Sequence, residues 1–381
     1  MSKQRALDAI NLKKTDRIPL WDWPDSPPLA ERLFNYDVWQ DTYRTGLDLW
    51  RWSGLDITPN ISGDPVEWNF PLVRYYDEVE ILDDPECLPY KTAYKKPVDK
   101  PYKSMYDFLG MTSRGAYWGV VPTMAISKYA FQSPEEVLRF NPLDVDTVTL
   151  EERIDFFHKF YKQKNERIGD DFLYIGWYYC TLFMWCVELF GWENFMMAAM
   201  SDPARFKEIL QQFQQLTKRD ITAICHVDDL PLIGCHDDLC TASGPVFSPD
   251  WYDENIFPLY EDIFKIIHDA GKKVFFVCDG NLMPLLPQLR SLNINGLACD
   301  HNNDFEKVLE TFSGKLMFGG AIDPALIQNG TEKEIDARIK YVCETAKHEP
   351  GYFFSSAAIN GTVDVDRALY FYERFHYHAK R

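Results

Sequence analysis

Residues 230–281 have the sequence LPLIGCHDDLCTASGPVFSPDWYDENIFPLYEDIFKIIHDAGKKVFFVCDGN and contain one complete strand–helix–strand unit. The runs Leu230–Cys235 and Lys273–Cys278 are short and continuously apolar, which is typical of strands in a parallel sheet. Between them, Ser248-Pro249 starts a helix with apolar residues every three or four positions, and Gly271 lies just beyond its end. This unit predicts a parallel β/α architecture.

The same alternation extends along the chain. Further apolar runs, each followed by an amphipathic helix, are Phe172–Tyr178, Ile294–Cys299, Leu316–Ile322 and Tyr352–Ser356. Two more candidate strands, Arg17–Trp23 and Leu47–Ile57, bring the number close to the eight of a closed barrel. We therefore expect an α/β fold, a (β/α)8 TIM barrel, formed by residues 1–381 as a single domain.

The segment 64–117 interrupts this rhythm. Glu67–Leu72 and Glu78–Leu82 alternate in polarity, and prolines are frequent between Pro65 and Pro101. Alternation of this kind is typical of antiparallel strands with one exposed face. We predict an antiparallel insertion or lid within the N-terminal half of the barrel.

Charge excludes one class of partner. The 381 residues include 40 Lys+Arg and 58 Asp+Glu, so the formal net charge is −18. Such a field repels polyanions, and we expect neither nucleic acid nor a membrane surface as a partner. The nine cysteines are an odd number and the N-terminus has no apolar leader, so a cytoplasmic location is expected.

Residues that can bind a metal follow neighbouring predicted strands. In TIM barrels the carboxyl-terminal strand ends form the active site, and there the sequence places His236, Asp238, Cys278 and Cys299. Zinc accepts mixed sulfur, nitrogen and oxygen donors, and a catalytic zinc needs three protein ligands and an open position. We predict Zn²⁺ bound by Cys278, Cys299 and either His236 or Asp238. A rival set is Cys235-His236-x3-Cys240, and buried free cysteine is also common in cores.

Acids and aromatic rings occur at the same strand ends. Asp22, Asp237 and Asp279 are candidates for general acid–base catalysis, because a partly closed barrel mouth shifts pKa values. A pocket for a planar substrate is predicted from Trp21, Trp23, Trp177, Tyr178 and Asn281. Each acid could instead cap a helix, and each ring could belong to ordinary packing. Dinucleotide, P-loop and common hydrolase motifs are absent from the sequence.

Several motifs resemble those of the uroporphyrinogen decarboxylase superfamily. In chain order they are Arg5-Ala6-Leu7, Thr15-Asp16-Arg17-Ile18-Pro19-Leu20, His236-Asp237-Asp238-Leu239, Gly244-Pro245 with Ser248-Pro249, Cys278-Asp279-Gly280-Asn281 and Gly319-Gly320-Ala321-Ile322-Asp323. The resemblance implies a (β/α)8 barrel. It also implies one of two activities, decarboxylation or methyl transfer in corrinoid systems.

The residues that follow Pro19 distinguish decarboxylation from methyl transfer. True decarboxylases follow this proline with an arginine-rich segment, usually Met-Arg-Gln-Ala-Gly-Arg, which suits a polycarboxylate. Here the segment is Trp21-Asp22-Trp23-Pro24-Asp25, whose acids repel such a substrate. The chain looks most similar to the substrate-specific methyltransferases of O-demethylase systems, which move a methyl group from a phenyl methyl ether to a corrinoid protein.

The sequence departs from the thiol-activating methyltransferases of this superfamily. Those enzymes hold zinc with a His-x-Cys pair on one strand and a cysteine near the last strand. The corresponding residues here are Phe276-Val277-Cys278 and Phe354-Ser355-Ser356-Ala357. Thiol activation is therefore in doubt, and the retained Cys278 with Cys299 indicates a rearranged site.

Together, these features predict a corrinoid-dependent methyltransferase. We expect it to move a methyl group from a small methylated substrate, best a methoxylated aromatic, to the Co(I) corrinoid of a partner protein, with zinc or acid assistance. The corrinoid is expected on a separate protein because the chain lacks an Asp-x-His-x-x-Gly motif. The alternatives are a metal-free decarboxylase of an aromatic or tetrapyrrole acid and a non-catalytic ligand-binding barrel. Methylamines and methylated thiols stay open as donors, and so does a homodimer.

Overall fold

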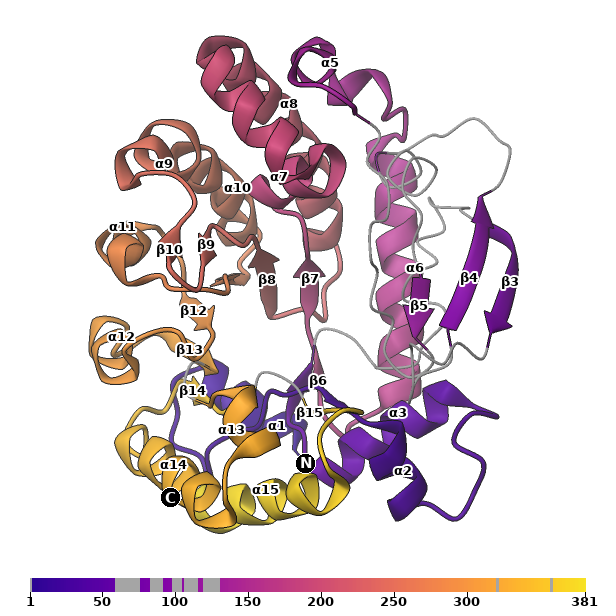
Figure 1. Ribbon diagram of the computed structural model, residues 1–381, viewed down its shortest axis with the longest axis vertical. Coiled ribbons are helices and arrows are strands. Elements are labelled where there is room, and N and C mark those ends of the chain that lie inside the picture. Colours follow the sequence, from indigo (N-terminus) through magenta and orange to yellow (C-terminus); the bar gives the residue numbers. More distant parts are fainter. Residues whose placement is uncertain are drawn as a thin grey trace.

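The computed structural model describes residues 2–58, 76–82, 92–97, 105, 116–118, 131–319, 322–356 and 359–381. Figure 1 shows most of the strands in the middle of the molecule with helices around them, and both chain ends toward the bottom of the view. The barrel strands are β2 (Ile57–Thr58), β6 (Leu173–Tyr174), β7 (Gly176–Tyr178), β8 (Leu232–His236), β11 (Lys273–Val277), β12 (Gly296–Cys299), β13 (Leu316–Gly319) and β14 (Tyr352–Phe353).

These strands are parallel and form a closed ring. Six of them are hydrogen-bonded in the order β14-β13-β12-β11-β8-β7, and β2 pairs with β6. The extended segment at Leu20 closes the gap, because it forms a parallel bridge to Phe354 and its carbonyl accepts from the Asp56 N–H at 3.0 Å. With β6 and β7 as two parts of one strand position, the described residues complete eight positions. The predicted (β/α)8 barrel is confirmed.

The helices of the described chain are α1 (Lys3–Ile10), α2 (Pro27–Leu33), α3 (Thr42–Ser53), α5 (Pro134–Arg139), α6 (Leu150–Ile168), α7 (Phe183–Ser201), α8 (Pro203–Cys225), α9 (Pro249–Asn255), α10 (Phe257–Asp269), α11 (Leu286–Ser291), α12 (Phe305–Thr311), α13 (Pro324–Asn329), α14 (Glu332–Thr345) and α15 (Val365–His378), with short 3-10 turns at Pro142–Asp144 and Met283–Leu285. Their starts follow local sequence signals. Ser248 caps α9, and Thr331 with Glu334 forms the capping box of α14. None of the described helices is both long and apolar enough to cross a membrane.

One predicted strand is wrong. Most of Leu47–Ile57 belongs to α3, and only Ile57 lies in a strand. The side chain of Asp41 caps the first turn of α3, and Gly54 ends the helix with a φ of 76°, which glycine adopts without strain. These two signals outweigh the apolar run between them.

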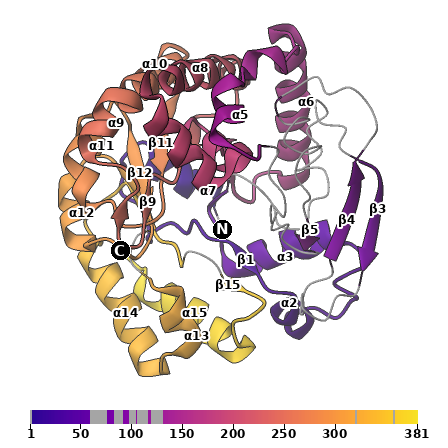
Figure 2. The same ribbon diagram turned by 45° about the horizontal axis from the view of Figure 1, so that its top comes forward.

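Other short strands lie outside the ring. They are β1 (Pro24–Asp25) paired with β15 (Ile359–Asn360), the hairpin β9 (Cys240–Thr241) and β10 (Gly244–Pro245), and the antiparallel sheet β3 (Tyr76–Leu82), β4 (Thr92–Pro97) and β5 (Ala116–Trp118). This three-stranded sheet overlaps the predicted insertion 64–117, extends one residue beyond it at Trp118, and stands apart from the barrel strands in Figures 1 and 2. The predicted strand Glu67–Leu72 lies outside the described residues. The lid function of the segment stays a prediction.

Aromatic packing fills the barrel interior, and α1 covers its amino-terminal end. Phe318 stacks between Phe275 and Phe353, with ring centroids 4.4 Å apart in both pairs. The buried residues Ala6, Ala9 and Ile10 of α1 belong to the same interior cluster as the first residues of β6, β8 and β13. The barrel is therefore closed by apolar contacts at this end.

Candidate metal site at the carboxyl end of the barrel

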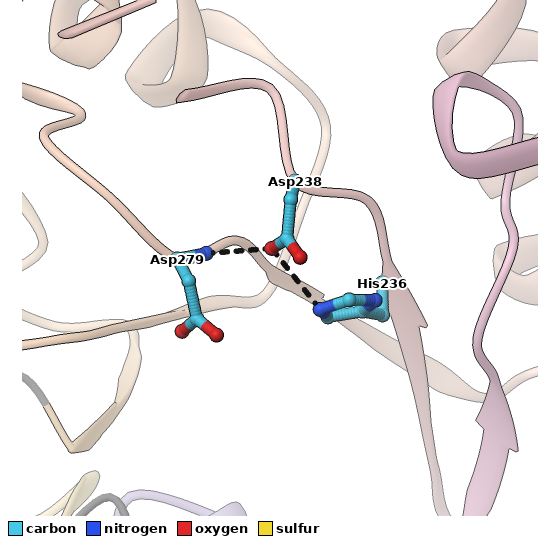
Figure 3. Close-up of side chains that lie close together, drawn as sticks. All are labelled: His236, Asp238 and Asp279. Atoms are coloured by element: carbon cyan, nitrogen blue, oxygen red, sulfur yellow. Dashed lines mark hydrogen bonds and ion pairs between the residues drawn. The ribbon is translucent and has the colours of Figure 1, made fainter. Parts of the chain in front are cut away.

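Three ligand-type side chains meet where β8 and β11 end. His236 is the last residue of β8 and pairs in register with Val277 of β11, so Asp238 and Asp279 follow at the same level. One ligand atom from each of the three side chains lies within 4.8 Å of the others. Figure 3 shows them pointing toward a common space. Among the described residues, this is the one group of His, Cys, Asp or Glu side chains close enough together to hold a metal ion.

The ring of His236 is held in a defined orientation. Its Nδ1 lies 3.2 Å from the carbonyl oxygen of Tyr179, and because that oxygen only accepts, we assign the Nδ1 proton to this contact. The Tyr179 ring stacks on the imidazole with centroids 4.5 Å apart. Trp177 stacks at 6.1 Å. Gly234 makes room for this indole, since a Cβ at Gly234 would lie 2.5 Å from Trp177 Cε3.

The other nitrogen of His236 faces a carboxylate. Its Nε2 lies 3.2 Å from Asp238 Oδ1, which also accepts from the Asp279 N–H at 2.9 Å (Figure 3). With the proton on Nδ1, a second proton on Nε2 makes this contact a charged hydrogen bond, and a bound metal ion would take the place of that proton. Metal-ligating histidines commonly donate the other ring N–H to a backbone carbonyl, as His236 does. The donor set of one nitrogen and two carboxylates fits a divalent ion such as zinc with an open position.

Burial and mutual charge shift the pKa values of the cluster. Burial alone would lower the pKa of His236, but its hydrogen bond to Asp238 and the nearby acids outweigh burial and raise that pKa. Burial would raise the pKa of Asp238, but the hydrogen bond and charge of His236 lower it. Burial and the charge of Asp238 raise the pKa of Asp279 to about 6. The cluster therefore favours cationic partners.

A further carboxyl group lies near the cluster. Glu188 of α7 is half-buried, and burial together with Asp238 raises its pKa to about 7, although the charge of His236 opposes this. Glu188 is absent from the predicted site residues, yet a signal for it exists, because it is the one charged residue of the apolar run Tyr178–Phe190. An ionisable group inside an apolar helix is itself a candidate functional residue.

Asp237 supports the site without facing it. Its buried carboxylate accepts from the backbone N–H groups of Leu182, Phe183 and Met184 at 2.6–2.9 Å and from Tyr260 Oη at 2.6 Å. This arrangement caps the first turn of α7. Side chains alternate along an extended segment, so Asp237 points away from the face that holds His236 and Asp238. Asp237 therefore holds the start of α7 beside the cluster, and the catalytic role predicted for it stays a prediction.

The two predicted cysteine ligands do not join the cluster. Cys278 is buried, and its Sγ accepts from the Leu239 N–H at 3.2 Å and contacts the Asp279 carbonyl oxygen at 3.4 Å. Burial raises the pKa of both thiols, at Cys278 and at Cys299, which favours their neutral form in the metal-free protein. Among the described residues, the group that could hold a metal ion contains Asp279, which the sequence predicted as an acid, and neither of the two cysteines. Cys235, of the rival set, is also fully buried.

The predicted catalytic Asp22 ties the first strand position to α15. It accepts from Ser356 Oγ at 2.7 Å and from Tyr372 Oη at 2.9 Å, and it is buried. Asn281 also has a local role, because its side-chain oxygen accepts from the Met283 N–H at 3.1 Å and starts the following turn. Neither residue lies in the cluster of metal-ligand type.

The predicted aromatic pocket is only partly assembled. Trp177 faces the barrel interior, whereas its neighbour Tyr178 points outward and donates to Asp220 at 2.8 Å, as strand alternation requires. Trp21 is buried in the interior with its ring centroid 4.6 Å from that of Trp23. Tyr179, the next residue and also an aromatic at this strand end, is 47% exposed and stacks on His236. Tyr179 and Trp177 therefore form the aromatic wall of the site.

An ionic network lies behind this wall. Arg153 is fully buried between Asp146 and Asp220 and forms an ion pair with each. Asp220 also accepts from Tyr178, so the network connects α6 and α8 to the barrel strand that ends at Tyr178. Its buried charges are paired with one another, as stability requires.

Solved structures and protein-family models were compared with this chain. The chain is similar in structure to a methyltransferase from Methanosarcina mazei, with a TM-score of 0.60 and 14% identity over 98% of each chain. A B12-independent methionine synthase from Shewanella sp. W3-18-1 has a TM-score of 0.47 and 12% identity, covering 95% of this chain and 97% of that one. A search of the curated proteins finds no match. The family model "Uroporphyrinogen decarboxylase (URO-D)" matches residues 121–377, and the chain therefore belongs to the uroporphyrinogen decarboxylase family.

Proposed function

We propose that this protein is a methyltransferase that moves a methyl group from a small methylated substrate to the Co(I) corrinoid of a partner protein. The observation that carries this proposal is the His236–Asp238–Asp279 cluster beside the aromatic wall of Tyr179 and Trp177. The likeness in fold to the Methanosarcina mazei methyltransferase supports the same reaction class. A methoxylated aromatic is the favoured donor, because a planar ring suits this wall.

The reaction places clear demands on the chain's own residues. When the methyl ether bond breaks, the methyl carbon goes to the acceptor, and the electron pair of the C–O bond stays on the oxygen. A bound zinc ion would act as a Lewis acid on that oxygen. Tyr179 and Trp177 hold the ring of the substrate, and Glu188, with its pKa raised to about 7 by burial, supplies the proton that the departing oxygen takes up.

A donor screen tests the proposed reaction. The purified protein is mixed with cob(I)alamin and with methoxylated aromatics, methylamines or methylated thiols in turn, and methylcobalamin is followed by its absorption spectrum. We expect methylcobalamin with at least one methoxylated aromatic, together with one equivalent of the corresponding phenol. Carbon dioxide release from an aromatic or tetrapyrrole acid without any cobalamin would instead establish the decarboxylase alternative.

Metal content tests the cluster independently of activity. We expect close to one equivalent of zinc in protein purified without chelators, and a loss of most of it in Asp238→Asn and Asp279→Asn. Asp250→Asn, a change at an acid in the first turn of α9, serves as the control and retains the metal. Zinc that stays bound in both cluster variants would contradict the assignment of these ligands.

A further inference from the structure

The second half of α7 carries an exposed apolar stripe. Trp192, Met196, Met197 and Met200 are 38%, 37%, 53% and 68% exposed, and they make up half of the large apolar side chains that are exposed in the described part of the chain. Trp192, Met196 and Met200 follow each other at intervals of four, so they share one helix face. Flexible methionine side chains are common on surfaces that bind other proteins.

This stripe lies at the mouth of the barrel. The first turn of α7 is capped by Asp237, between two residues of the metal-type cluster. The last turn of α7 leads directly into α8, which returns to the start of β8 and therefore begins at the carboxyl end of the strands. In Figure 1 the arrowheads of β7 and β8 point toward α7, and in Figure 2 the helix lies beside α5 as that end comes forward. Both ends of α7 thus lie on the carboxyl-terminal side of the strands, which is the side that carries the site.

Area and charge indicate what kind of partner covers the stripe. With ~200 Å² for each whole side chain, the four residues expose about 400 Å², an area typical of the largest apolar patch on a monomer, which is often functional. A stable dimer needs ~800 Å² from each copy, so the stripe fits a transient encounter better than a second copy. Between residues 183 and 202 the chain has no Lys or Arg but has three acids, Glu188, Glu193 and Asp202, the last of which caps α8. A second copy would bring the same acids and a net charge of −18.

We propose that the stripe of Trp192, Met196, Met197 and Met200 is the docking surface for the protein that presents the corrinoid. This inference rests on the proposed function. The partner is expected to carry an apolar patch framed by lysine or arginine residues, which would pair with the acids beside the stripe. Docking here would bring the corrinoid over the mouth while the substrate stays on the wall formed by Tyr179 and Trp177.

The test compares two methyl acceptors. The double variant Met197→Gln/Met200→Gln keeps side-chain length, charge and helix propensity, and Tyr377→Gln is a matched control, since Tyr377 is 62% exposed near the C-terminal end of α15. Each protein is assayed with free cob(I)alamin and with a purified corrinoid protein that accepts methyl groups from the wild-type chain. Light scattering after size-exclusion chromatography gives the oligomeric state of each.

We expect the double variant to lose at least tenfold in kcat/KM with the corrinoid protein, mainly through KM, and to stay within twofold of wild type with free cob(I)alamin. The control should match wild type with both acceptors. Unchanged kcat/KM with the corrinoid protein, or an equal loss with both acceptors, would overturn the docking surface. A wild-type dimer that the double variant splits would show that a second copy covers the stripe. Absence of transfer from wild type to free cob(I)alamin would instead refute the proposed function.

Discussion

Gly280 offers a sharp test of how the backbone positions the site. This residue follows Asp279 directly and has a φ of 86°, a conformation that costs a side-chain-bearing residue about 1–2 kcal/mol. A Cβ at Gly280 would also lie 2.7 Å from the carbonyl oxygens of Cys240 and Thr241, which belong to strand β9 beside the site. Overpacking of this kind typically costs about 1–3 kcal/mol. Gly280→Ala should therefore lower the free energy of unfolding by about 2–5 kcal/mol.

Gly271→Ala separates these two contributions. Gly271 has a φ of 72°, but a Cβ added there would meet nothing within 4 Å, so only the conformational cost of about 1–2 kcal/mol applies. Both variants are unfolded with urea under the same conditions. We expect Gly280→Ala to be less stable than Gly271→Ala by about 1–3 kcal/mol, the overpacking part of its cost.

Metal binding gives a second readout for the same pair. The displaced backbone at Gly280 moves the neighbouring Asp279, so zinc affinity measured by competition with a chelating dye should fall at least tenfold in Gly280→Ala. It should be unchanged in Gly271→Ala, which is remote from the cluster. Equal stability of the two variants, with equal zinc affinity, would refute the view that the contact of Gly280 with β9 positions Asp279.

Other parts of the molecule give further expectations. Arg153→Met leaves two buried aspartates without their cation and should cost about 3–5 kcal/mol in urea unfolding, whereas Lys159→Met, in an exposed ion pair with Asp155, should cost about 0.5 kcal/mol or less. Gly234→Ala pushes Trp177 away from His236 and should weaken zinc binding in the same dye competition, without removing any ligand. The pKa of Glu188 is raised by burial from 4.5 to about 7, so the metal-free folded protein binds a proton there that the unfolded chain has lost. Stability should therefore decline as pH rises from 4.5 to about 7. Asp279, whose pKa is raised to about 6, adds to this decline, so Glu188→Gln should make it shallower, most clearly above pH 6; an unchanged slope there would place the titration elsewhere.

The barrel was predictable because its strands are continuous apolar runs between helices with clear start signals. Ser248 and the Thr331–Glu334 capping box start helices where the sequence indicated. The Leu47–Ile57 error arose where a helix and a strand both explain a short apolar run, and the cap at Asp41 and Gly54 decided for the helix. Local caps thus carry information that periodicity alone does not.

The sequence predicted where the candidate site lies, at the carboxyl ends of the strands, but not which residues form it. His236, Asp238 and Asp279 follow strands that pair in register, and strand order is visible in the sequence pattern. Which side each residue faces depends on the backbone after the strand ends, so the sequence left the choice between His236 and Asp238 open, whereas the structure brings both into the cluster. Cys278 is buried and lies outside the cluster, and no pattern in the sequence indicates that its side chain faces the core.

The closure of the amino-terminal end of the barrel by α1 has a kinetic consequence. Apolar contacts of Ala6, Ala9 and Ile10 close the amino-terminal end of the barrel. As far as the described residues show, substrate and product therefore reach the site only through the carboxyl-terminal end. A partner docked on α7 would cover that carboxyl-terminal opening. The methyl donor must then enter before the partner binds, and the demethylated product must wait until the partner departs. Such a compulsory order predicts that excess partner slows turnover, in the manner of an inhibitor competing with the donor for the free enzyme.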